Sequence, residues 1–269
     1  MSAVSHTSEL VTRRYGELTR YILPGLAIWH GFFARTGGVS EPPYATLNTA
    51  YHTQDPRAFE NRERLFAALG LTDRPIRVLN PCHGERIVFL NQPDWQMTSQ
   101  VVLARTEAAF TQTPGSYLLV STADCIPAII SDKLGSFVGI VHLGWRNLVA
   151  GLTRKVIGAL ASYYGAAPET LVIGMGPCIY PCCYRVRDPV QRNDPFWQPF
   201  LRAYGNGSYG IDLVTAFKTQ LNHCGVKAES IQETRLCTAC RVERFFSCYR
   251  DGYHSGRFAN LVGLRPNDV

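Results

Sequence analysis

Short, continuously apolar segments recur along this chain and constrain its fold more than any other feature. Their lengths and their β-branched residues predict β-strands, and their lack of polar alternation indicates strands that are buried on both faces. The predicted strands outnumber the predicted helices and do not alternate regularly with them. The sequence therefore favours an α+β fold with mixed sheets over a Rossmann-type repeat. The segments lie at residues 76–79, 86–90, 117–120, 126–130, 137–141, 171–173 and 244–248.

Helices are predicted at three places by apolar residues at helical spacing, capping residues and terminal glycines. The first covers residues 56–69, with Asp55 as its N-cap. The second covers residues 148–164 as one continuous helix. The third begins after Asp212 and stops at Gly225.

The domain organisation follows from length and from the absence of any obvious divider. The chain has 269 residues, of which 46% are hydrophobic and 18% charged, as in ordinary soluble domains. No repeat, low-complexity segment or long linker interrupts it. We therefore expect a flexible N-terminal tail over residues 1–20 and a single catalytic domain over residues 21–269, present as a monomer.

Charge and hydropathy exclude two classes of partner. The net charge is +6, but the basic residues are scattered and form no cluster of the kind that binds nucleic acid. The apolar stretch over residues 21–34 is too short and too interrupted for a membrane span. We therefore expect no nucleic acid and no membrane, and a mild preference for small anions such as phosphate.

Three potential metal ligands, His83, Cys125 and His142, lie next to predicted strands. Cys125 and His142 flank one predicted hairpin, which brings them together, and His83 on a second hairpin completes the set. Two imidazoles and one thiolate suit zinc, and a free fourth position is typical of a catalytic zinc site. The same residues include a Cys-His pair, which suits nucleophilic catalysis. Asp124 is positioned to orient a ligand or a water.

Nine cysteines are present, an odd count in a long sequence with no predicted signal peptide. This pattern predicts reduced thiols and a cytoplasmic location. Cys237 and Cys240 have the spacing of half a structural zinc motif, but the adjacent Cys182 and Cys183 do not. We therefore interpret these four residues as core thiols and expect no second zinc.

Taken together, the motifs of this chain resemble the YfiH family, also called the multicopper polyphenol oxidase or laccase-domain family, or peptidoglycan editing factor. The resemblance extends nearly from end to end, and T-A-D-C-x-P and H-x-G-W-R are its most distinctive parts. The matching segments are residues 33–40, 46–48, 61–65, 122–127, 142–146, 176–184, 237–238, 244–247 and 256–259.

The resemblance implies a four-layer α/β/β/α sandwich of mixed β-sheets, of the CNF/YfiH type, with zinc held by His83, Cys125 and His142. It implies phosphorolysis of adenosine, inosine and methylthioadenosine, and deamination of adenosine, with a nucleoside and phosphate as small-molecule partners. Cys125, His142 and Asp124 are the expected catalytic residues. The expected substrate-binding residues are Arg35, Asn48 and Arg146, because guanidinium groups match phosphate and Asn48 lies in a family motif.

Three alternatives remain open. A copper-dependent polyphenol oxidase needs several histidines per metal cluster; the chain has seven in all, and only two lie in convincing motifs, so copper is the weaker choice. In a Cys-His amide hydrolase acting in peptidoglycan precursor editing, Cys125 is the nucleophile and His142 its base. The third alternative is a non-enzymatic protein that retains a structural metal.

Overall fold

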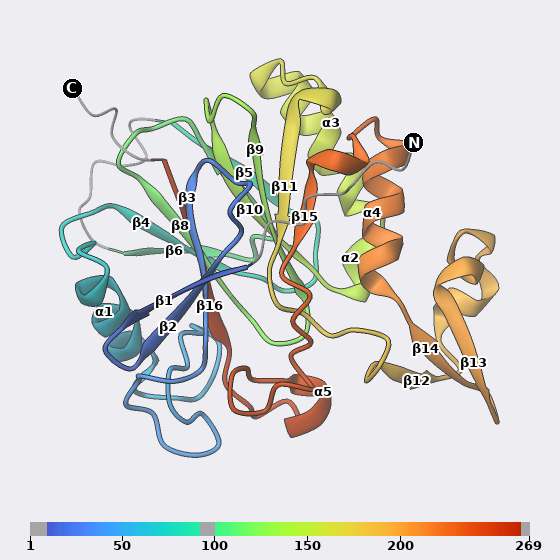
Figure 1. Ribbon diagram of the computed structural model, residues 1–269, viewed down its shortest axis with the longest axis horizontal. Helices are drawn as coiled ribbons and strands as arrows, with labels where there is room; N and C mark the ends of the chain where they lie inside the picture. Colours follow the sequence, from blue (N-terminus) through green and yellow to red (C-terminus); the bar gives the residue numbers. More distant parts are fainter. Residues whose placement is uncertain (1–9, 92–99, 265–269) are drawn as a thin grey trace.

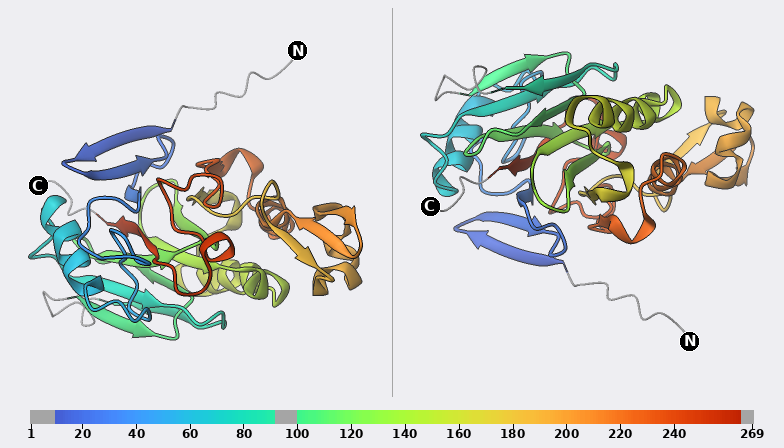
Figure 2. Two further views of the ribbon diagram at one scale, coloured as in Figure 1. Left: turned by 90° about the horizontal axis from the view of Figure 1, so that it is seen from below. Right: turned by 90° about the horizontal axis from the view of Figure 1, so that it is seen from above.

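The computed structural model describes residues 10–91 and 100–264. Within these ranges, two large mixed sheets pack face to face, and a small antiparallel sheet projects from one end of the molecule (Figures 1 and 2). The first sheet contains, in spatial order, β1 (Val11–Tyr15), β2 (Leu18–Ile22), β3 (Trp29–Phe33), β16 (Phe258–Gly263), β8 (Tyr117–Thr122), β4 (Ile76–Asn80) and β6 (Val101–Ala104). The second contains β15 (Ile231–Glu233), β11 (Leu171–Met175), β9 (Ile126–Asp132), β10 (Val138–Leu143), β7 (Ala108–Thr111) and β5 (Ile87–Leu90). The small sheet contains β12 (Arg185–Arg187), β14 (Ser208–Ile211) and β13 (Leu201–Gly205).

Helices cover the outer faces of both large sheets: α1 (Ala58–Ala68) on the first, and α2 (Trp145–Val149), α3 (Leu152–Tyr164) and α4 (Leu213–His223) on the second. The short α5 (Cys248–Asp251) instead borders the central interface between the sheets. Short 3₁₀ turns lie at Pro168–Thr170, Val190–Asn193, Pro195–Phe200 and Ala228–Ser230. None of the helices in the described ranges is long and apolar enough to span a bilayer.

Three apolar interfaces hold the layers together. Phe32 and Val120 of the first sheet pack with Ile140 of the second in the central interface. On the outer faces, Leu65 of α1 packs in the cluster of the first sheet, and Phe217 of α4 packs in that of the second. Burying side chains of this size stabilises the fold by roughly 1.5–3 kcal/mol each. The predicted α/β/β/α sandwich of mixed sheets is therefore confirmed.

The predicted helices are largely correct, and glycine geometry explains the main difference. α4 begins directly after Asp212 as expected, and Asp212 accepts the amide of Thr215 at 2.9 Å. The expected Asp55 cap of the first helix is wrong, because α1 starts at Ala58 with Arg57 as its N-cap, and Asp55 accepts the Arg57 amide instead. Residues 148–164, however, belong to two helices. Gly151 has a φ of 75°, which ends α2 and starts α3 in a new direction.

The expected flexible tail over residues 1–20 is wrong for its second half, and residues 1–9 lie outside the described ranges. β1 and β2 form a hairpin, and β2 pairs with β3 in the first sheet. Arg20 is buried there, and its Nε donates to the carbonyl of His30 at 2.9 Å. The charged residues Arg13, Arg14 and Glu17 give this segment a polar composition that does not predict a strand, although it forms the edge of the first sheet.

The predicted strand at residues 244–248 is also wrong. Phe245 and Phe246 are fully buried, but they lie in an irregular segment between a turn at residues 242–244 and α5. The guanidinium of Arg250 donates to the carbonyls of Thr238, Ala239 and Phe245, so a side chain satisfies backbone groups that a sheet would otherwise pair.

Candidate functional site

Three chain crossovers between the large sheets build the site. β4, β6 and β8 run parallel in the first sheet, so their carboxyl ends lie at one edge. From that edge each strand leads into a strand of the second sheet, namely β5, β7 and β9. The crossovers carry His83, Glu107 and Cys125. Each crossover contains one non-glycine residue in the left-handed region: His83 at a φ of 61°, Arg105 at 52° and Asp124 at 80°. Such conformations concentrate at functional sites.

The expected hairpin between Cys125 and His142 is confirmed. β9 and β10 are antiparallel, with His142 opposite Pro127 and Leu143 opposite Ile126. Cys125 directly precedes β9, so it lies at the same end of the hairpin as His142. His83 does not lie on a second hairpin as expected, because β4 and β5 belong to different sheets.

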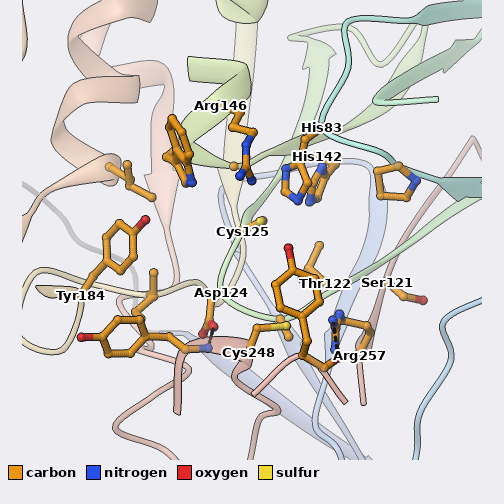
Figure 3. A pocket seen from close by; sticks show the side chains of 18 of the residues that line it. His83, Ser121, Thr122, Asp124, Cys125, His142, Arg146, Tyr184, Cys248 and Arg257 are labelled. Carbon is orange, nitrogen blue, oxygen red and sulfur yellow. Dashed lines mark hydrogen bonds between the residues drawn. The ribbon is translucent and has the colours of Figure 1, made fainter. Parts of the chain in front are cut away.

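The ligand atoms of His83, Cys125 and His142 all lie within 4.8 Å of one another, and Figure 3 shows the three side chains converging. His83 Nδ1 is buried and has no hydrogen-bond partner among the described residues. A Cβ atom at Gly144 would lie 2.8 Å from His83 Nδ1 and 3.1 Å from Cys125 Sγ, so only glycine leaves this space open. An unpartnered imidazole nitrogen, a thiol and a second imidazole around one space fit a zinc ion.

Glu107 lies behind His142 and was not predicted from the sequence. It is fully buried, and its Oε2 accepts from His142 Nδ1 at 2.8 Å. Its Oε1 accepts from the amides of Cys82 and Gly84 at 2.7 and 2.9 Å. This carboxylate therefore joins the His83 loop to the second imidazole and leaves His142 Nε2 free for a metal, an arrangement common around metal-bound histidine.

The charges and hydrogen bonds around Glu107 and His142 favour a positive charge on the His142 imidazole. Burial alone raises the pKa of Glu107, but hydrogen bonds from His142 and from the Cys82 and Gly84 amides outweigh it and lower the pKa. Burial alone lowers the pKa of His142, but Cys125 and Glu107 raise it to about 10. A divalent cation bound beside His142 would be stabilised by the same two groups, the Cys125 thiolate and the Glu107 carboxylate.

The three side chains line a cavity of about 400 Å³, large enough for a small organic ligand. Arg146, in the first turn of α2, also lines the cavity, and Figure 3 shows its guanidinium directed toward Cys125. This guanidinium also stacks over the ring of Trp145, 4.6 Å from the centroid. Residues from distant segments complete the lining: His52, Tyr184, Leu213, Cys248, Tyr249, Tyr253 and Arg257.

Asp124 lines the same cavity, but hydrogen bonds occupy both of its oxygens. One accepts the hydroxyl of Thr238 at 2.6 Å and the other the amide of Tyr249 at 2.7 Å. Burial raises the pKa of Asp124, although these hydrogen bonds oppose the rise. Asp124 therefore positions its neighbour Cys125 and ties two loops to it.

The structure does not bring Arg35 and Asn48 to the cavity. Arg35 donates to the carbonyl of Ala45 through Nε at 2.9 Å and Nη2 at 2.6 Å, and it stacks over Phe246. Asn48 is fully buried and accepts the amide of Arg257 at 2.9 Å. Its contribution is thus indirect, because Arg257 is the residue that lines the cavity.

Comparison with known proteins agrees with this architecture. The crystal structure of YlmD from Geobacillus stearothermophilus superposes with a TM-score of 0.87 at 28% identity, covering 94% of this chain and 98% of that one. The Bacillus licheniformis YfiH structure gives a TM-score of 0.85 at 29% identity, covering 94% and 99%.

Sequence relatives extend the agreement. A Deinococcus radiodurans protein named purine nucleoside phosphorylase is 32% identical over 90% of this chain and 91% of its own length. The Escherichia coli protein named purine nucleoside phosphorylase YfiH is 32% identical over 86% and 91%. The model of the family described as multi-copper polyphenol oxidoreductase laccase matches residues 29–265. This chain therefore belongs to that laccase-domain family, together with the YfiH and YlmD proteins.

Proposed function

We propose that this chain is a zinc-dependent purine nucleoside phosphorylase, with the metal held by His83, Cys125 and His142. The observation that carries the proposal is the convergence of this ligand set with Arg146 and tyrosine rings around one cavity. The names of the relatives point to the same reaction.

Phosphorolysis requires a held phosphate and a stabilised purine leaving group. A phosphate oxygen bonds to the ribose C1′ while the bond from C1′ to the purine nitrogen breaks, and the purine leaves with the bonding pair and takes up a proton. Arg146 suits phosphate because its planar guanidinium donates in a bidentate manner, and stacking on Trp145 restricts its orientation. Zinc, when bound, would supply Lewis-acid polarisation in the same cavity.

The purine would lie against the aromatic side of the cavity. The rings of Tyr184 and Tyr249 meet at 5.6 Å in an edge-to-face arrangement. Burial, followed by the charges of Cys125 and Asp124, raises the pKa of Tyr184, so its hydroxyl stays protonated at neutral pH. That hydroxyl is our candidate donor to the leaving purine, which becomes more basic as the bond breaks.

The proposal extends to inosine and methylthioadenosine as substrates, and to adenosine deamination. Inosine and methylthioadenosine share the purine and the ribose C1′ on which phosphorolysis acts. Deamination uses the same purine pocket but a different carbon: water attacks C6 of adenosine, the amino group takes up a proton and leaves as ammonia, and inosine remains. The measured products therefore decide which reaction dominates.

Copper-dependent phenol oxidation is less favoured by the donor set. Within the described residues, the two clusters with metal-ligand spacing contain two histidines in total, whereas multicopper sites use several histidines per cluster. Amide hydrolysis is the second candidate, because the same residues suit a thiol nucleophile. The Glu107 carboxylate orients His142, and His142 in turn contacts the Cys125 thiol, as a base does beside its nucleophile.

The deciding experiment combines metal analysis with product analysis on adenosine, with and without phosphate. We expect adenine release that depends on phosphate and is lost after chelation and in Cys125→Ala. Cys82→Ser is the matched control, because Cys82 is exposed and uses only its backbone amide in the site. Full turnover by Cys125→Ala would refute the proposal. Chelator-resistant hydrolysis of an amide substrate, blocked by alkylation of Cys125, would instead support the hydrolase.

A further inference from the structure

A second group of thiols lies outside the cavity described above. Cys182 and Cys183 lie in the turn at residues 181–183, between β11 and β12, and Cys237 and Cys240 lie in the loop after β15. Their four sulfurs all lie within 4.8 Å of one another. The interpretation of these residues as core thiols is wrong for Cys182 and Cys240, which are exposed.

The spacing of the sulfurs matches tetrahedral coordination. Cys240 Sγ lies 3.5 Å from Cys182 Sγ and 3.3 Å from Cys183 Sγ, and the latter two are 4.0 Å apart. Four sulfurs bound to zinc at about 2.3 Å are separated by about 3.8 Å in a regular tetrahedron. A disulfide would engage only two of the four and would require a sulfur separation of about 2.05 Å.

The local backbone points toward Cys237. The amides of Cys240 and Tyr180 donate to its sulfur. Cys237 is 8% exposed and sits deepest, while the more accessible Cys182 and Cys240 leave the cluster open to an entering ion.

We propose that Cys182, Cys183, Cys237 and Cys240 form a structural zinc site that is separate from the catalytic one. Zinc binding would release protons from the thiols and hold the two loops together. Hydrogen bonds between the Cys178 backbone and the backbones of Leu236 and Thr238 already join these loops. The site requires no assumption about the reaction in the cavity.

The position of this site links it to the cavity. The amide of Ile179, on one loop, donates to the carbonyl of Asp124 at 2.9 Å. The hydroxyl of Thr238, on the other loop, donates to the Asp124 carboxylate at 2.6 Å. The clamp would therefore hold both supports of Asp124, the residue before Cys125, and would act as a positioning element for the catalytic site.

Zinc content per chain tests the proposal on the full-length protein, produced with zinc and measured by elemental analysis. We expect the Cys182→Ser/Cys240→Ser double variant to contain one zinc fewer than the wild type. Cys224→Ser, a partly exposed thiol at the end of α4, is the matched control and should retain the wild-type count. A double variant with the wild-type count would overturn the proposal. The one-zinc difference holds whether or not His83 and its partners bind metal, so failure of the catalytic proposal gives a different result.

Thiol protection supplies a second test that does not depend on a folded variant. Native wild-type protein is treated with iodoacetamide before and after chelation, and the labelled peptides are identified by mass spectrometry. We expect the four cluster cysteines to resist labelling until zinc is removed, while Cys224 reacts in both cases. Rapid labelling of Cys182 and Cys240 in the untreated, zinc-loaded protein would contradict the proposal. So would a disulfide between any two of the four.

Discussion

Replacing Glu107 with Gln reverses the hydrogen-bond polarity behind His142. The wild-type carboxylate accepts four hydrogen bonds, from the amides of Cys82 and Gly84, from His142 Nδ1 and from Asn147 Nδ2. A Gln oxygen in the Oε1 position keeps the two amide bonds. The NH₂ group of the Gln side chain in the variant would then face two other hydrogen-bond donors, His142 Nδ1–H and Asn147 Nδ2. His142 can accept from this NH₂ group only if it carries its own proton on Nε2, the nitrogen that faces the metal position.

The expected loss follows from this change of tautomer. A partner behind a metal-bound histidine contributes about 10–100-fold in metal affinity, equivalent to about 1.4–2.8 kcal/mol. Because Glu107 is fully buried and the substitution disturbs both of its Oε2 contacts, we expect the upper end, roughly a 100-fold weaker zinc affinity. Phosphorolysis at limiting zinc should fall by the same factor.

Competition with a chromogenic chelator measures the zinc affinity directly, and circular dichroism verifies that the variant is folded. Glu85→Gln is the matched control. It lies two residues from His83, but its carboxylate is exposed in an ion pair with Lys155, which contributes less than about 1 kcal/mol. Zinc affinity within a factor of two of wild type in a folded Glu107→Gln protein would refute the proposed role of Glu107.

Other perturbations test the remaining parts of the site and of the fold. Gly144→Ala places a methyl group 2.8 Å from His83 Nδ1, so zinc binding should be lost while the backbone, with an ordinary φ of −92°, tolerates alanine; retained zinc in the purified variant would contradict this. Arg146→Ala should raise the KM for phosphate about tenfold or more and leave the KM for adenosine nearly unchanged, because a charged hydrogen bond contributes about 1.5–3 kcal/mol; steady-state kinetics with each substrate varied separates the two. Burial lowers the pKa of His30 to about 4 from 6.5, and its Nε2 accepts the amide of Leu23. The unfolded chain therefore takes up the proton first, and stability present above pH 6.5 is lost as the pH falls toward 4. Urea unfolding should show about 2 kcal/mol less stability at pH 5 than at pH 8 from this residue, a difference absent in His30→Gln.

Local sequence signals predicted the parts of the structure that depend on near neighbours. The turn between β9 and β10 is closed by Asp132, which accepts the amide of Ser136 at 2.7 Å, and this hairpin brings Cys125 beside His142. The predicted helix start after Asp212 has an equally local reason, because the Asp212 carboxylate accepts the amide of Thr215. Such contacts lie within a few residues or across one turn, so residue type and spacing are enough to predict them.

Motif membership did not reveal which way a side chain points. Arg35 and Asn48 both lie in family motifs, yet their polar groups satisfy backbone atoms inside the protein. Glu107 gave only a weak signal, a charged residue directly before the buried β7. Its role depends on the Cys82 and His142 groups that it contacts, and these come from other crossovers and strands.

The sequence by itself determined the mixed α+β class, the family and the three candidate ligand residues, because these depend on periodicity, residue chemistry and local turns. The tertiary structure decided that His83, Cys125 and His142 meet in front of Glu107, that tyrosines share a cavity with Arg146, and that four thiols from two distant loops converge. The physical reason lies in the packing of the two sheets. Parallel strands end at one edge and cross to the opposite sheet together, and the register between the sheets is set by the whole buried core and not by any one segment.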